Sequence, residues 1–124
     1  MTGAAEADGG SGGGPLEFDR FEFVLLKRPA SAPALSDEAS AALQQRHLDH
    51  LTAMHAAKHL AVAGPFDEQP DESLRGLCLY HTGSIERTKE LAERDPAVLA
   101  GRLEVEVMYL YCEKGAIRVP WSEP

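Results

Sequence analysis

Four of the five histidines lie close together in one segment, RHLDHLTAMHAAKH. His55 and His59 are four residues apart, and His47 and His50 are three apart, so on a helix each pair would present both imidazoles on one side. Paired imidazoles can bind zinc, but a zinc site also needs a third protein ligand and partners that orient the rings. The segment lacks the glutamate of an HExxH motif and has a lysine between His55 and His59. We therefore expect no metal site and interpret His55 and His59 as solvated surface residues.

His47 differs from the other histidines because it falls within the apolar stripe of the predicted helix. A buried neutral imidazole loses free energy unless both ring nitrogens find partners. Two interpretations remain open from the residues alone: a structural histidine hydrogen-bonded in the core, or a general acid or base oriented by a carboxylate. The candidate carboxylates are Asp95, Asp49 and Asp67, and spacing does not choose among them. Asp95 precedes a proline at a helix start, where helix capping would also explain it.

The elements that must position these residues follow from periodicity and from capping signals. We predict a strand around residues 21–27, a helix from Asp37 to about Leu60 capped by Ser36, strands at 60–63 and 74–82, a helix at 85–94, a helical turn at 96–100 and a strand at 102–112. The βαββαβ order predicts an α+β, ferredoxin-like fold, with an antiparallel sheet carrying its helices on one face. Apolar residues on both faces of the first and last strands predict that the other face is covered by a second copy in a homodimer.

Composition bounds the domains and excludes several partners. The net charge is −8, which argues against nucleic acid and against an anionic membrane surface, and no apolar run approaches the length of a spanning helix. We predict a Gly-rich disordered tail at residues 1–17, one domain at 18–115 and a C-terminal extension at 116–124. The tail's GGSGGG has no strand before it or helix after it, so we expect no cofactor. The absence of a signal sequence and of a CxxC pair predicts a cytoplasmic protein with reduced cysteines.

Several short motifs together resemble the YciI-like (YCII-related) family of small dimeric α+β barrel proteins. The resemblance covers about residues 20–115, and its motifs are FEFVLLKRP, RHLDHL, AGPF at 63–66, and DPAVLAG at 95–101 ahead of LEVEVMYL. It implies a dimeric α+β barrel with a His–Asp active site in a cleft near the dimer interface. Carried over by motif, the catalytic pair is His47 and Asp95, while Arg46, Gly64 and Pro65 fall where relatives shape the pocket. Relatives often have an aromatic residue two positions after the aspartate, and this chain has alanine, which leaves one wall of the pocket more open.

The chemistry implied by such a pair is proton transfer. A carboxylate bound to one imidazole nitrogen fixes the tautomer and leaves the other nitrogen available as a base or acid. Neither Ser84 nor Cys78 has the motif of a nucleophile, which favours proton transfer over covalent catalysis. The resemblance implies the same direction, since halide elimination and lactone isomerisation occur in the family and its superfamily. We therefore predict a small-molecule enzyme of lyase or isomerase type, with a non-catalytic small-molecule-binding or interaction module as the alternative.

Overall fold

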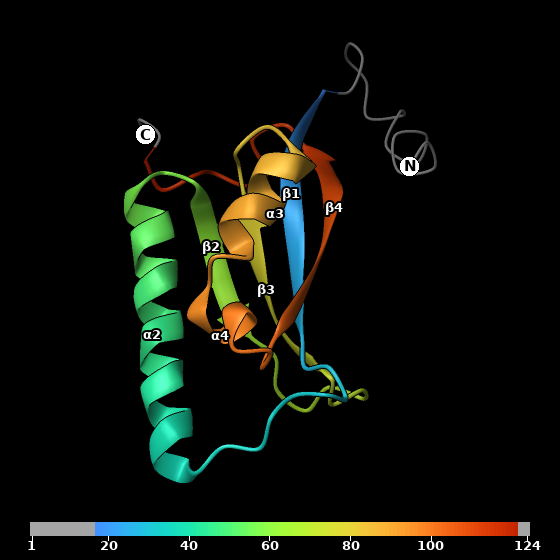
Figure 1. Ribbon diagram of the computed structural model, residues 1–124. Coiled ribbons are helices and arrows are strands. Elements are labelled where there is room, and N and C mark those ends of the chain that lie inside the picture. The colour runs from blue at the N-terminus through green and yellow to red at the C-terminus, as the bar shows by residue number, and fades with distance from the viewer. Residues whose placement is uncertain (1–16, 122–124) are drawn as a thin grey trace.

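A computed structural model of the chain describes residues 17–121. Its elements are β1 (Phe18–Lys27), α2 (Asp37–Ala56), β2 (Leu60–Pro65), β3 (Leu74–Tyr80), α3 (Ile85–Ala92), α4 (Pro96–Leu99) and β4 (Glu104–Glu113). The four strands form one antiparallel sheet in the order β2-β3-β1-β4. The predicted α+β, ferredoxin-like fold is therefore confirmed, with the second helix of the βαββαβ pattern in two pieces (Figure 1).

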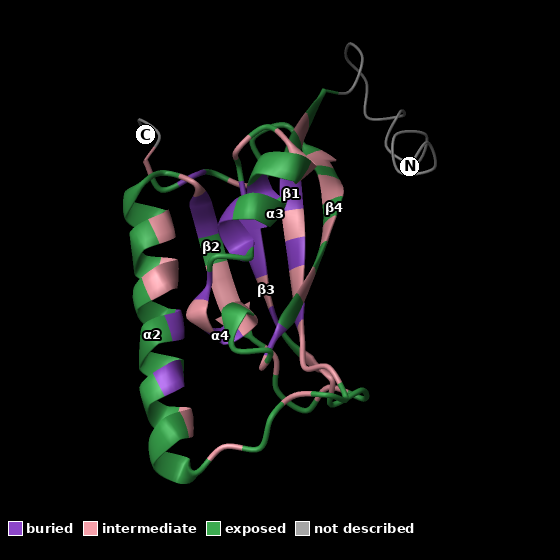
Figure 2. Cartoon of the chain, in the orientation of Figure 1, coloured by how far each residue is buried: buried purple, intermediate pink, exposed green. Residues whose placement is uncertain are grey.

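The three helices lie on one face of the sheet, and the main core lies between the two layers (Figure 1). Along β1, Val24 and Leu26 point toward the helices, whereas Phe21 points to the opposite face. Leu43 of α2 and Leu91 of α3 close the same core from the helix side. Figure 2 shows the result, with buried residues gathered on the strands and on the sides of the helices that face them.

The long helix α2 begins where the sequence predicts and ends earlier. The Ser36 side chain accepts a hydrogen bond from the backbone N–H of Ala39 at 3.1 Å, which caps the helix. The helix ends at Ala56, because Lys58 takes a left-handed backbone conformation (φ 66°) and the chain then turns into β2. The prediction of one continuous helix to about Leu60 is therefore wrong, and His59 lies beyond the helix end.

The strand β2 is longer than predicted, since it includes Gly64 and Pro65 instead of stopping before them. A proline is tolerated here because β2 is at the edge of the sheet. Opposite this end of β2, a Cβ added to Gly76 would lie 2.7 Å from the carbonyl oxygen of Gly64. Glycine at position 76 is thus what allows β2 and β3 to pair closely at this point.

A second, smaller core covers part of the sheet face that lies away from the helices. It consists of buried Phe21, Ala61, Leu79 and Val119, with Ile117 and Trp121 packed against it. The first part of the predicted extension at 116–124 therefore folds back onto the sheet of its own chain. Most of the predicted tail, residues 1–16, lies outside the described residues, as do residues 122–124. Glu17 is described, and its carbonyl accepts a hydrogen bond from the Lys114 N–H at 2.9 Å.

Within residues 17–121, none of the helices has the length and apolar character needed to cross a bilayer.

Candidate functional site

The structure brings His47 and Asp95 into contact although they are 48 residues apart. The Nδ1 atom of His47 lies 2.5 Å from Oδ2 of Asp95. Both side chains are buried, with 9% of His47 and 3% of Asp95 exposed. Asp49 and Asp67, the other two carboxylates considered from the sequence, are exposed and bond to groups near them in sequence, namely the Gln45 side chain and the Glu68 backbone N–H. Among the three candidates, the described structure pairs His47 with Asp95.

Asp95 has a second contact that fixes its position. Its Oδ1 atom accepts a hydrogen bond from the backbone N–H of Ala97 at 2.9 Å and so caps α4, with Pro96 at the first helical position. Each carboxylate oxygen thus has its own donor, so capping and orientation of the imidazole coexist. Because Oδ1 is held by the cap of α4, the other carboxylate oxygen, Oδ2, is free to contact His47 of α2.

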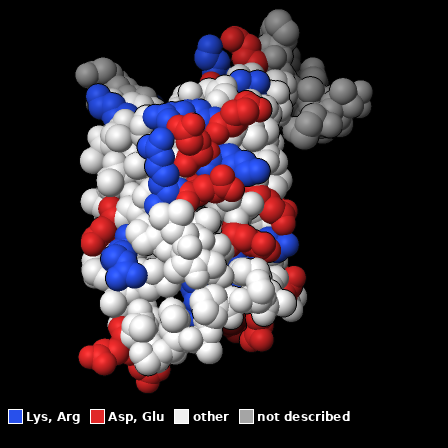
Figure 3. Space-filling view, in the orientation of Figure 1, with Lys and Arg blue, Asp and Glu red and all other residues white. Residues whose placement is uncertain are grey.

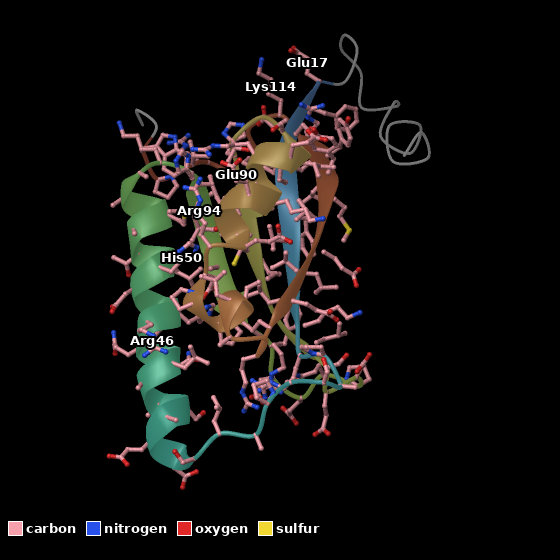
Figure 4. The ribbon with its side chains drawn as sticks, in the orientation of Figure 1. Glu17, Arg46, His50, Glu90, Arg94 and Lys114 are labelled. Carbon is pink, nitrogen blue, oxygen red and sulfur yellow. The ribbon has the colours of Figure 1, made fainter. Side chains whose placement is uncertain are left out.

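His47 lines a cavity with a volume of about 290 Å³ between α2 and the sheet. Gly64 and Pro65 line the same cavity, and so does Ala97. Arg46 does not line the cavity, because it lies on an exposed side of α2 (Figure 4). The structure therefore brings together His47, Asp95, Gly64 and Pro65 but leaves Arg46 outside.

A family model described as the YCII-related domain matches residues 21–110, which is most of the chain. The chain belongs to the YCII-related domain family. No curated protein matches it.

One solved structure similar to this YCII-related protein is 5-chloro-2-hydroxyhydroquinone dehydrochlorinase (TftG) from Burkholderia phenoliruptrix AC1100, in complex with 2,5-dihydroxybenzoquinone. The TM-score is 0.50, the sequence identity is 17%, and the match covers 73% of this chain and 90% of that one. At this level of identity, the likeness shows a shared fold.

His50 lies next to the pair on the side of α2 that faces α3 and α4 (Figure 4). Burial lowers the pKa of its imidazole, and the nearby charge of Asp95 opposes this effect. Its Nε2 atom is buried and has no hydrogen-bond partner among the described residues. From the sequence, His50 was noted only for its spacing of three residues from His47. Its position beside Asp95 depends on the packing of α4 against α2, which the sequence does not reveal.

Ser84 and Cys78, neither of which has a nucleophile motif, both have structural environments that disfavour nucleophilic attack in this YCII-related protein. Ser84 caps α3 through a hydrogen bond from the backbone N–H of Arg87 at 3.0 Å. Burial raises the pKa of the Cys78 thiol to about 12, and the nearby charge of Asp95 adds to the effect. A thiol with so high a pKa is protonated near neutral pH and is a poor nucleophile. Both cysteines are free thiols.

A metal site at His55 and His59 would need both residues four apart on one helix. His59 lies outside α2, so the two imidazoles do not share a helix face. The Nδ1 atom of His55 lies 3.1 Å from the carbonyl oxygen of Leu60, within hydrogen-bond distance. No group of three or more histidine, cysteine, aspartate or glutamate side chains suited to hold a metal ion occurs in the part of the chain that the structure describes.

A buried carboxylate that sequence reasoning did not single out is Glu22, on the helix-facing side of β1 with none of its surface exposed. Its Oε1 accepts hydrogen bonds from the backbone N–H and the hydroxyl of Thr82 at 2.7 and 3.0 Å and from the hydroxyl of Thr88 at 2.8 Å. Its Oε2 accepts one from the N–H of Gly83 at 3.3 Å. With all its partners in the β3–α3 turn and in α3, Glu22 fixes α3 to the sheet. The alternation of β1 gives the side on which Glu22 lies, but not the donors that surround it.

Proposed function

We propose that this YCII-related protein is a small-molecule enzyme in which His47 transfers a proton and Asp95 positions its ring. The observation that carries the proposal is the contact of 2.5 Å between His47 Nδ1 and Asp95 Oδ2, at the wall of a cavity large enough for a small molecule. A carboxylate at Nδ1 favours the tautomer with the proton on that nitrogen. Nε2 is then the nitrogen left to act on a molecule in the cavity.

The reaction class that fits one such base is elimination or isomerisation. Nε2 takes a proton from a C–H group of the bound molecule, and the electron pair stays on the substrate. In an elimination, that electron pair forms a double bond and expels a leaving group such as chloride; in an isomerisation, the imidazolium returns the proton to another carbon. Asp95 supports the imidazolium at either stage through its charge. Neither reaction requires a nucleophilic side chain. This agrees with the role of Ser84 as the cap of α3 and with the protonated thiol of Cys78.

The fold of TftG is compatible with this class, since a dehydrochlorinase removes a proton and a chloride from its substrate. The test is chloride release from 5-chloro-2-hydroxyhydroquinone, followed with a chloride electrode against a blank without protein. We expect release above the blank rate. A chain that binds small molecules in the cavity but accelerates no release from chlorinated hydroxyhydroquinones would contradict this elimination and favour the non-catalytic binding module.

We also propose a homodimer formed through the sheet face opposite the helices, in a cytoplasmic location. Val62 and Met108, both on that face, are 52% and 41% exposed, and a second copy packed on the sheet would cover them. The two free cysteines are compatible with a reducing compartment.

The homodimer predicts a solution mass twice the chain mass of 13.4 kDa, measured by light scattering after size exclusion. Val62→Asp is expected to shift the mass toward that of one chain, because a charge on this face would be buried in the dimer. Leu99→Asp is the matched control, since Leu99 is exposed on α4 on the helix side. A single-chain mass for the unmodified protein would refute the dimer.

A further inference from the structure

Three arginines from separate segments line the cavity that contains His47: Arg28 directly after β1, Arg75 in β3 and Arg102 just before β4. They lie close enough together for the charges of Arg102 and Arg75 to act on Arg28, whose pKa is lowered first by burial and then by these two like charges. In Figure 3 the surface around α3 mixes acidic and basic groups, whereas a hollow below it shows basic atoms at its inner edge.

The positive charge of this cluster is not compensated within the described structure. Among residues 17–121, neither Arg28, Arg75 nor Arg102 forms an ion pair within 4.0 Å. The part of the cavity wall formed by residues 17–121 contains no aspartate or glutamate. The neighbouring Lys27 has its own partner, with Glu106 Oε2 at 2.9 Å. Three like charges close together repel one another, and a bound ligand of opposite charge would relieve this repulsion.

The guanidinium groups are held in place but keep donors free. Nη1 of Arg102 donates to the carbonyl oxygen of Pro33 at 2.8 Å, and Nη1 of Arg75 donates to that of Glu72 at 3.2 Å. An arginine side chain has five N–H donors, so each of these groups has several left. Nε of Arg28 is buried and has no hydrogen-bond partner in the described part of the chain, so this donor is available to an acceptor oxygen.

The rest of the wall indicates the shape of the ligand. Leu43, Leu51 and Leu103 supply an apolar surface beside the arginines. A pocket with one apolar wall, one basic cluster and one imidazole fits a small molecule with an apolar body and an anionic oxygen.

We propose that the cavity binds a small organic anion, whose carboxylate or phenolate oxygens are held by Arg28, Arg75 and Arg102 while its apolar body lies against the leucines. The inference rests on the proposed function for what happens next. When His47 Nε2 removes a proton from a carbon conjugated to that anionic group, the electron pair spreads onto oxygen, where the arginines stabilise it. Binding of the anion itself does not depend on proton transfer.

The test is calorimetric binding of benzoate and of its neutral analogue benzamide to the full chain. We expect benzoate to bind at least ~10-fold more tightly than benzamide, and its affinity to fall as salt is added. Arg28→Met and, separately, the more exposed Arg75→Met are each expected to weaken benzoate binding by ~10-fold or more. Arg46→Met is the matched control, since Arg46 is outside the cavity, and it should bind benzoate like the unmodified protein.

Equal affinity for the two probes, no benzoate binding, or unchanged binding in folded Arg28→Met and Arg75→Met would each overturn the inference. His47→Gln separates this outcome from the proposed function. If benzoate binds both the unmodified protein and His47→Gln but neither releases chloride, the anion site stands and the enzymatic proposal fails. If Arg28→Met and the unmodified protein release chloride at equal rates, the enzymatic proposal stands and the anion site fails.

Discussion

His47→Gln is expected to lower the rate of chloride release at saturating substrate by about 100-fold or more. A glutamine amide can donate a hydrogen bond to Asp95, so the buried carboxylate keeps a partner and the fold is retained. The amide has no basic nitrogen, however, and cannot accept the proton that Nε2 takes. The loss should therefore appear in kcat, with benzoate affinity changed by no more than about threefold.

The control is Arg46→Gln, which alters the neighbouring residue of α2 on an exposed side of the helix. We expect its turnover to remain within about twofold of the unmodified protein, since surface changes away from a site have small effects. Turnover in His47→Gln equal to that of Arg46→Gln would show that His47 is structural, which is the interpretation that the sequence alone left open.

Glu22→Ala is expected to produce the largest loss of stability among single substitutions at polar positions. It removes an acceptor from the N–H of Thr82 and from the hydroxyls of Thr82 and Thr88, and it leaves a void between β1 and α3. Buried donors without partners cost roughly 1–3 kcal/mol each, so we expect the free energy of unfolding to fall by about 3–5 kcal/mol. Urea unfolding followed by circular dichroism measures this change.

Two further variants serve as controls for the loss of unfolding free energy in Glu22→Ala. Glu106→Ala removes an exposed carboxylate from the neighbouring strand, together with its ion pair to Lys27, and is expected to lower the free energy of unfolding far less than Glu22→Ala does. Glu22→Gln retains an acceptor oxygen and should recover part of the loss. Equal costs for Glu22→Ala and Glu106→Ala would mean that the Glu22 network does not hold α3 to the sheet.

Much of the fold is predictable from the sequence because its signals are local. Ser36, Ser84 and Asp95 each stand directly before a helix and cap it, as their residue types indicate. The early end of α2 is not predictable in this way, since it depends on Lys58 in a left-handed conformation that residue type does not favour. The extension of β2 through Pro65 depends on its place at the sheet edge, which only the topology reveals.

The site is less accessible to such reasoning because its members come from distant segments. Spacing left three carboxylates open for His47; the resemblance to YCII-related proteins singled out Asp95, and the packing of α4 against α2 places it there. The resemblance also placed Arg46 at the pocket, but Arg46 does not line the cavity, because adjacent residues on a helix point in different directions. The three cavity arginines have no sequence motif in common, and only the pairing of β1 with β3 and β4 brings their segments together.

In the proposed mechanism, Asp95 holds the proton of His47 on Nδ1 and thereby leaves Nε2 as the base. Nitrogen NMR of the histidine rings tests it most directly, because protonated and unprotonated ring nitrogens have distinct chemical shifts. At a pH where the His47 ring is neutral, we expect Nδ1 to be protonated and Nε2 to be unprotonated, with this preference lost in Asp95→Ala. A neutral His47 that carries its proton on Nε2 in the unmodified protein would contradict the account.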